Sequence, residues 1–290
     1  MSHERAEIYD DRPCALGEGP LWHPERDQLF WFDIVKMRLC TREADTAHHW
    51  QFDEPVSAAG WVDHATLFVA SATRLFRFDL GTGEAEDVSP LEAQRTDTRS
   101  NDGRADPWGG FWISSMGLRA EAGAGAIYRY YRGELRQLHG GLTIPNAIAF
   151  APMRPLAYFT DTLTNIVQRQ ALDPETGWPS EDPVPWLDLG PLDLVPDGAV
   201  TDAAGNLWIA HWGAGCVGAY DPDGAQIGKH PLPGRHATCP AFGGPDETTL
   251  YCTSASEGIA EPILEAQPEN GMTFALPGLG PGRPEPRVLL

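Results

Sequence analysis

One short apolar and aromatic segment recurs six times along the chain. Consecutive copies start roughly 38 to 50 residues apart, which is the spacing of β-propeller blades. Each copy is rich in Leu, Phe, Trp, Tyr or Ile, as expected of a buried strand. The copies occupy residues 29–32, 67–70, 111–114, 157–160, 207–210 and 250–253.

Turn sequences and further strands surround these segments. Turns at 23–27, 106–110 and 202–206 precede three copies, and apolar stretches at 75–80 and 217–220 follow two others and run into glycine-containing turns. This arrangement indicates hairpin meanders of about four strands per unit. No amphipathic helix of useful length interrupts them. The pattern therefore predicts an all-β fold, a six-bladed β-propeller with four-stranded antiparallel blades around a central channel, formed by residues 1–290 as one domain.

The two ends of the chain bear on ring closure. Residues 6–9 precede the first full unit, and residues 286–290 end the last. We expect the N-terminal segment to supply the outer strand of the final blade, because closure leaves only short, protected strand edges.

Composition narrows the possible partners and compartment. A net charge of −20 repels nucleic acid and anionic membranes, so neither is expected as a partner. The five cysteines are odd in number and lack a Cys-x-x-Cys pair, which favours a reducing compartment over a disulfide framework. The N-terminus has no apolar run, and no apolar stretch approaches the roughly 20 residues of a membrane span. We expect a cytoplasmic monomer.

Polar residues recur at one position of the repeat. Roughly 10 or 11 residues before each aromatic segment, where the innermost strand of a blade begins, the chain has Glu18, Ser57, Asn101, Asn146, Asp197 and Cys239 or Pro240. Four of these are carboxylates or carboxamides, and equivalent positions of a propeller converge on its axis. Such groups are costly to bury unpaired, and their oxygens suit Ca²⁺, Mg²⁺ or Mn²⁺. Alternatively, each is an ordinary turn residue, as Asn101-Asp102-Gly103 and Pro196-Asp197-Gly198 permit.

Motifs around these residues resemble those of the regucalcin/gluconolactonase family of six-bladed propellers, which includes bacterial aldonolactonases. The resemblance extends over essentially the whole chain, in order and with similar spacing. The matching motifs are Leu16-Gly17-Glu18-Gly19-Pro20, Arg99-Ser100-Asn101-Asp102-Gly103, Ile144-Pro145-Asn146 and Pro196-Asp197-Gly198.

The resemblance implies a function and a role for each of five residues. Glu18, Asn146 and Asp197 would bind one divalent metal ion, while Asn101 and Arg99 would contact the substrate. The expected reaction is hydrolysis of a sugar lactone, an aldono-1,4- or 1,5-lactone such as glucono-, xylono-, arabino- or galactonolactone. The metal would polarise the carbonyl, and Asp197 would act as general base on water. Oxygen donors favour Ca²⁺, with Zn²⁺, Mn²⁺, Mg²⁺ or Fe²⁺ as alternatives.

One loop departs from the family pattern. Many relatives carry an acidic residue shortly after the methionine of the third blade. Here Met116 is followed by Gly117, Leu118 and Arg119, and the first acid is Glu121. The resemblance therefore does not supply a substrate contact from this loop.

Two other functions remain open at this stage. The same metal site could cleave organophosphates or another ester, or the propeller could bind metal or sugar without catalysis. Arg99 and Asn101 beside three ligands argue against metal storage alone.

Several other polar and aromatic residues could have either a functional or a structural role. His211 and Cys239 are expected to be structural, and Asp161 and Thr162 fit either a supporting role at the channel wall or blade packing. We expect four tryptophans to fill space between blades: Trp22, Trp61, Trp108 and Trp212.

Overall fold

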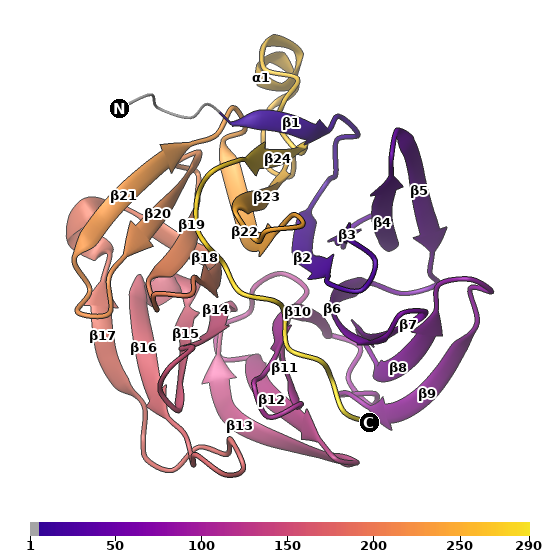
Figure 1. Cartoon of the computed structure of the whole chain (residues 1–290), viewed down its shortest axis with the longest axis vertical. Helices are drawn as coiled ribbons and strands as arrows, with labels where there is room; N and C mark the ends of the chain where they lie inside the picture. The colour runs from indigo at the N-terminus through magenta and orange to yellow at the C-terminus, as the bar shows by residue number, and fades with distance from the viewer. Residues whose placement is uncertain (1–5) are drawn as a thin grey trace.

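The computed structural model describes residues 6–290, whose strands form six four-stranded antiparallel sheets in a ring (Figure 1). The six-bladed β-propeller predicted from the repeats is confirmed. Blade one consists of β2 (Gly17–His23), β3 (Gln28–Asp33), β4 (Arg38–Glu43) and β5 (Thr46–Gln51). Blade two consists of β6 (Val56–Asp63), β7 (Thr66–Ser71), β8 (Arg74–Asp79) and β9 (Ala85–Pro90). Blade three consists of β10 (Thr98–Ala105), β11 (Phe111–Gly117), β12 (Gly125–Tyr131) and β13 (Glu134–Leu142).

The other three blades complete the ring. Blade four consists of β14 (Pro145–Phe150), β15 (Leu156–Asp161), β16 (Ile166–Ala171) and β17 (Val184–Asp188). Blade five consists of β18 (Val195–Thr201), β19 (Leu207–Trp212), β20 (Cys216–Tyr220) and β21 (Gln226–Pro231). Blade six consists of β22 (His236–Gly243), β23 (Thr249–Ala255), β24 (Thr273–Leu276) and β1 (Glu7–Asp10). The helical elements of the described chain are short: α1 (Glu261–Ala266) and the 3₁₀ turns Thr162–Thr164 and Gly190–Leu192. None of the helices in residues 6–290 has the length and apolar character to span a membrane.

The N-terminal strand closes the ring as predicted. Strand β1 pairs antiparallel with β24, with Glu7 opposite Ala275 and Ile8 opposite Phe274. The last blade therefore contains strands from both ends of the chain, and the outer edge of β24 is covered.

The recurring aromatic segments are the second strands of the blades, and their side chains pack between neighbouring blades. Phe30 and Phe32 of blade one, for example, form one buried cluster with Leu67 and Val69 of blade two. Equivalent clusters join each of the other neighbouring pairs. Burying one such side chain contributes about 1.5–3 kcal/mol, so the core that holds the ring lies between the blades rather than at the axis.

Every inner strand carries a β-bulge near the position of the recurring polar residue. The pairing shifts between Glu18 and Leu21, Ser100 and Gly103, Asn146 and Ala149, and Pro196 and Ala199, and equivalent shifts occur in β6 and β22. A bulge bends the strand and re-aims a side chain. Repetition of this bulge explains how polar residues of several blades lie at one end of the channel.

Two glycines allow the inner strands to approach one another closely. Gly19 has a φ of +52°, and a Cβ there would lie 2.2 Å from the carbonyl oxygen of Ser57 in the next blade. A Cβ on Gly198 would lie 2.3 Å from the sulfur of Cys239. Both positions lie beside candidate metal ligands, so these glycines set the width of the channel there.

Beyond β24, the chain leaves blade six and crosses the ring as an irregular tail (Figure 1, yellow). The backbone N–H of Val288 donates to the carbonyl of Trp61 at 2.9 Å, and that of Leu289 donates to Gly109 at 2.9 Å. Glu285 forms a buried ion pair with Arg104 on β10. Residues 286–290, which the repeat pattern places at the end of the last unit, therefore contact blades two and three.

Candidate metal and substrate site

One cavity of about 340 Å³ brings together all five residues proposed from the sequence. Glu18 comes from β2, Arg99 and Asn101 from β10, Asn146 from β14 and Asp197 from β18. The site is thus formed by the inner strands of four blades. The cavity has the size of a small-molecule site, and the roles of these residues remain predictions.

Other residues complete the cavity, and the position of some of them in the repeat could have identified them from the sequence. The second strand of each blade runs antiparallel to the inner strand, so its end lies where the inner strand begins. Met116, Thr162 and Trp212 each lie five residues after the start of an aromatic segment, and all three line the cavity. The remaining lining residues, which lack this signal, are Leu16, Ile144, Leu163, Val195 and Glu257.

A chain of hydrogen bonds fixes the amide side chains. The Arg99 guanidinium donates to Oδ1 of Asn101 at 2.8 Å, and Nδ2 of Asn101 donates to Oδ1 of Asn146 at 2.9 Å. Nδ2 of Asn146 donates to the Thr162 hydroxyl at 2.9 Å, which donates to the carbonyl of Pro196 at 2.9 Å. Oδ1 of Asn146 accepts one hydrogen bond, from Asn101, so its second lone pair stays available for a cation. Thr162 therefore supports the channel wall.

Two carboxyl groups lie buried beside these amides. Glu18 and Asp197 are each 6% exposed. Burial raises the pKa of Glu18 to about 8, with a further contribution from the charge of Asp102. Burial, followed by the charges of Glu18 and Asp102, raises the pKa of Asp197 well above its usual range. Both groups thus need a nearby positive charge to be ionised at neutral pH.

No side chain in residues 6–290 supplies that charge by direct contact. Neither Glu18 nor Asp197 forms an ion pair, and the guanidinium of Arg99 donates instead to Asn101 and to the carbonyl of Ser100. Burial lowers the pKa of Arg99, and the charges of Glu18, Glu257 and Asp197 oppose that shift.

The donor set fits a hard divalent cation. It consists of two carboxylates and a carboxamide oxygen, which are the ligands that Ca²⁺ and similar ions prefer. Among residues 6–290, no group of three or more His, Cys, Asp or Glu residues is arranged to bind a metal. The observation that favours a cation is that the buried carboxyl groups of Glu18 and Asp197 have no ion-pair partner among residues 6–290.

Two of the other residues weighed from the sequence, His211 and Cys239, have packing roles. His211 is fully buried, and its Nε2 lies 3.0 Å from the Tyr220 hydroxyl. Cys239 is buried against Gly198 and does not line the cavity. Trp212 differs from the expectation that it fills space between blades, because it lines the cavity.

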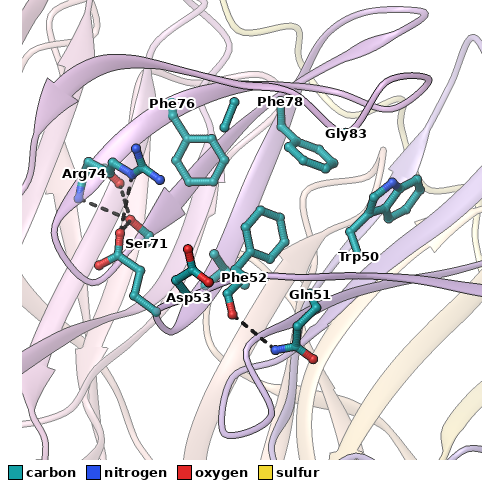
Figure 2. Close-up of a pocket in the computed structure, with 12 residues that line it drawn as sticks. Trp50, Gln51, Phe52, Asp53, Ser71, Arg74, Phe76, Phe78 and Gly83 are labelled. Atoms are coloured by element: carbon teal, nitrogen blue, oxygen red, sulfur yellow. Dashed lines mark hydrogen bonds and ion pairs between the residues drawn. The ribbon is translucent and has the colours of Figure 1, made fainter.

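A second cavity, of about 310 Å³, lies between blades one and two and is shown in Figure 2. Its polar groups satisfy one another: the Ser71 hydroxyl donates to Glu54 at 2.8 Å, and Arg74 lies 3.5 Å from the same carboxylate. Its walls are largely aromatic, formed by Trp50, Phe52, Phe76 and Phe78. No uncompensated buried carboxylates meet there, so the channel cavity is the candidate site.

Comparison with known proteins places the chain in a family. The sequence model of the SMP-30/gluconolactonase/LRE-like region matches residues 16–256, which span all four inner strands that form the site. The chain belongs to the SMP-30/gluconolactonase/LRE-like family. The resemblance inferred from the sequence motifs is confirmed.

Relatives in this family match over nearly their full length. The pentonolactonase XacC of Haloferax volcanii is 35% identical over 95% of both chains. The 6-deoxy-6-sulfogluconolactonase of Pseudomonas putida is 32% identical over 95% of both. The crystal structure of a calcium-binding protein, regucalcin from Agrobacterium tumefaciens, superposes with a TM-score of 0.96 at 36% identity, covering 98% of this chain and 97% of that one.

Proposed function

We propose that this chain is a hydrolase that opens sugar lactones with one bound divalent cation. The observation that carries the proposal is the convergence of two buried, unpaired carboxyl groups with Asn146, Asn101 and Arg99 in one cavity. Relatives named as lactonases, at up to 35% identity among those compared above, support the substrate class. Their names differ in the sugar, so they leave the specific lactone undefined.

The cation would be held by Glu18, Asn146 and Asp197. Oxygen-only donors favour Ca²⁺, and Mg²⁺, Mn²⁺, Fe²⁺ or Zn²⁺ are the alternatives. The similar structure named as a calcium-binding protein supports this choice. When bound, such a cation supplies Lewis-acid polarisation of the lactone carbonyl.

The side chains of the site divide the remaining work. Asp197 takes a proton from the attacking water through the carboxylate oxygen that is not engaged as a ligand. Arg99 and Asn101 orient the sugar, because Arg99 still has free donors on its guanidinium beyond its bonds to Asn101 and Ser100. The tetrahedral species collapses with cleavage of the ring C–O bond, and the protonated Asp197 returns its proton to the departing ring oxygen, which yields the aldonic acid.

Removal of the metal tests the proposal. After exhaustive chelation, we expect hydrolysis of a panel of five- and six-carbon aldonolactones to fall to the uncatalysed rate, and addition of Ca²⁺ to restore it. Rates are followed by the acid released. Unchanged hydrolysis in the chelated protein would contradict metal dependence. Tight Ca²⁺ binding without hydrolysis of any lactone would favour a non-catalytic propeller, and activity on a fluorophosphate alone would favour the organophosphatase alternative.

Thr162→Val tests the assignment of Asn146 as a ligand. Valine has nearly the shape of threonine but cannot accept the hydrogen bond from Nδ2 of Asn146. Loss of a group that orients a ligand typically lowers metal affinity by about 10- to 100-fold, and we expect such a loss for Ca²⁺. Calorimetric titration measures it. The matched control is Thr164→Val, an exposed residue of the same turn, which should leave the affinity unchanged. Equal affinities for the two variants would remove Asn146 from the ligand set.

A further inference from the structure

We propose that Glu257 determines substrate charge: it makes the site select uncharged sugar lactones over lactones that carry an anionic substituent far from the carbonyl. This inference rests on the proposed function. Glu257 lies outside the set of residues identified from the sequence, in the loop that follows β23 of blade six.

Glu257 is held by its backbone, while its side chain is free. Its N–H donates to the carbonyl of Ala15 at 2.9 Å, and its own carbonyl oxygen lies 3.1 Å from Nδ1 of His236. The residue is exposed, and within residues 6–290 no cationic side chain forms an ion pair with its carboxylate. Because the backbone is held in place and the carboxylate is in no ion pair, Glu257 places a negative charge at the cavity mouth.

The wall beside Glu257 suits the apolar face of a sugar. His236, which contacts the Glu257 carbonyl, stacks on Trp212 with ring centroids 4.0 Å apart and an angle of 18° between the rings. Trp212 lines the cavity. His236 thus links Trp212 and Glu257, two lining residues from blades five and six, so an aromatic surface lies next to a hydrogen-bond acceptor for hydroxyl groups.

The acid expected from blade three in many relatives is turned away. Oε2 of Glu121 accepts the backbone N–H of Arg119 at 3.0 Å within its own turn, and Glu121 does not line the cavity. The carboxylates that line it are Glu18, Asp197 and Glu257. Because the first two face the proposed cation, Glu257 is the acidic group left to act on the substrate.

The charge balance explains the selectivity. A divalent cation would offset Glu18 and Asp197. Arg99 and Glu257 remain with opposite charges, and of the two Glu257 is the more exposed to solvent. A lactone whose carbonyl lies at the ligands extends its exocyclic end toward the mouth, where Glu257 lies. Hydroxyl groups of the substrate can donate to the carboxylate of Glu257, whereas a phosphate, sulfonate or carboxylate group on the substrate is repelled by it.

The test compares kcat/KM for glucono-1,5-lactone and for its 6-phosphate ester in the metal-loaded protein. We expect wild type to prefer the uncharged lactone. Glu257→Gln should reduce that preference by about tenfold, the effect of removing one unit charge near a partly solvated site, and Glu257→Arg should reduce it further. The change should appear as a lower KM for the phosphate ester, with kcat for the uncharged lactone nearly unchanged. The difference between wild type and variant should shrink at high salt.

The control is Glu43→Gln, which removes the same charge from an exposed position at the end of β4 in blade one. It should leave the preference unchanged. If Glu257→Gln and Glu43→Gln show the same preference while both hydrolyse lactones, the role of Glu257 is wrong and the proposed function stands. If wild type hydrolyses no lactone of the five- and six-carbon panel, the proposed function fails, and the inference fails with it.

Discussion

Replacement of Asp197 by Asn is expected to lower kcat for lactone hydrolysis by about 100- to 10,000-fold, the range contributed by a positioned general base. Asn keeps a carbonyl oxygen that can bind the cation, but it cannot take a proton from water. The substitution is well suited to the site, because burial already raises the pKa of Asp197 and the surroundings tolerate a neutral group there. We therefore expect the variant to fold and to bind Ca²⁺ with reduced affinity.

Two measurements separate catalysis from metal binding in this variant. Calorimetric titration gives the Ca²⁺ affinity, and kcat is then measured at saturating Ca²⁺. Asp193→Asn is a matched control, because Asp193 is exposed, lies four residues earlier in the chain and already has the left-handed backbone that Asn tolerates. Near-normal turnover by Asp197→Asn with Ca²⁺ bound would refute the general-base assignment.

Glu285→Ala is expected to destabilise the protein by about 3–5 kcal/mol, the usual cost of leaving one partner of a buried ion pair alone. The side chains of Arg104 and Glu285 are 9% and 7% exposed. Arg104 has one other partner, the carbonyl of Pro240 at 3.2 Å, and its Nε has none. Removal of Glu285 would therefore leave a buried guanidinium with little compensation. Urea unfolding monitored by tryptophan fluorescence measures the loss.

A double variant distinguishes charge from packing at this position. Arg104→Met with Glu285→Leu removes both charges and fills the volume, so it should recover most of the stability lost in Glu285→Ala. Glu43→Ala, at an exposed strand end, should change stability little. Equal losses in the single and double variants would show that the tail acts through its packing. The buried Val288 is then the residue to test next, by Val288→Ala.

The architecture could be predicted because each blade is built from a local pattern. A buried aromatic strand between turns is specified by neighbouring residues, and six copies at one spacing leave a ring as the arrangement that buries every blade face. Glu18, Asn101, Asn146 and Asp197 could be brought together for the same reason. Residues at one register of equivalent units must lie at one end of the channel, and this required no knowledge of any side-chain contact.

Other features depend on contacts between residues far apart in the chain. The ion pair of Arg104 with Glu285 joins positions 181 residues apart, and the path of the tail across the ring has no counterpart in the repeat. Glu257 lies in an irregular loop, where exposed acids are common and no period marks one as special. The hydrogen bonds that turn Asn146 toward the cavity depend on Thr162 and Asn101 from neighbouring strands.

The sequence alone thus determined the blades, the closure of the ring and the side chains that meet on its axis, because these follow from short-range pattern and periodicity. The tertiary structure alone decided which charges lack a partner, which wall carries Glu257 and how the tail is held. Those properties depend on distances and burial between blades, which local pattern does not encode.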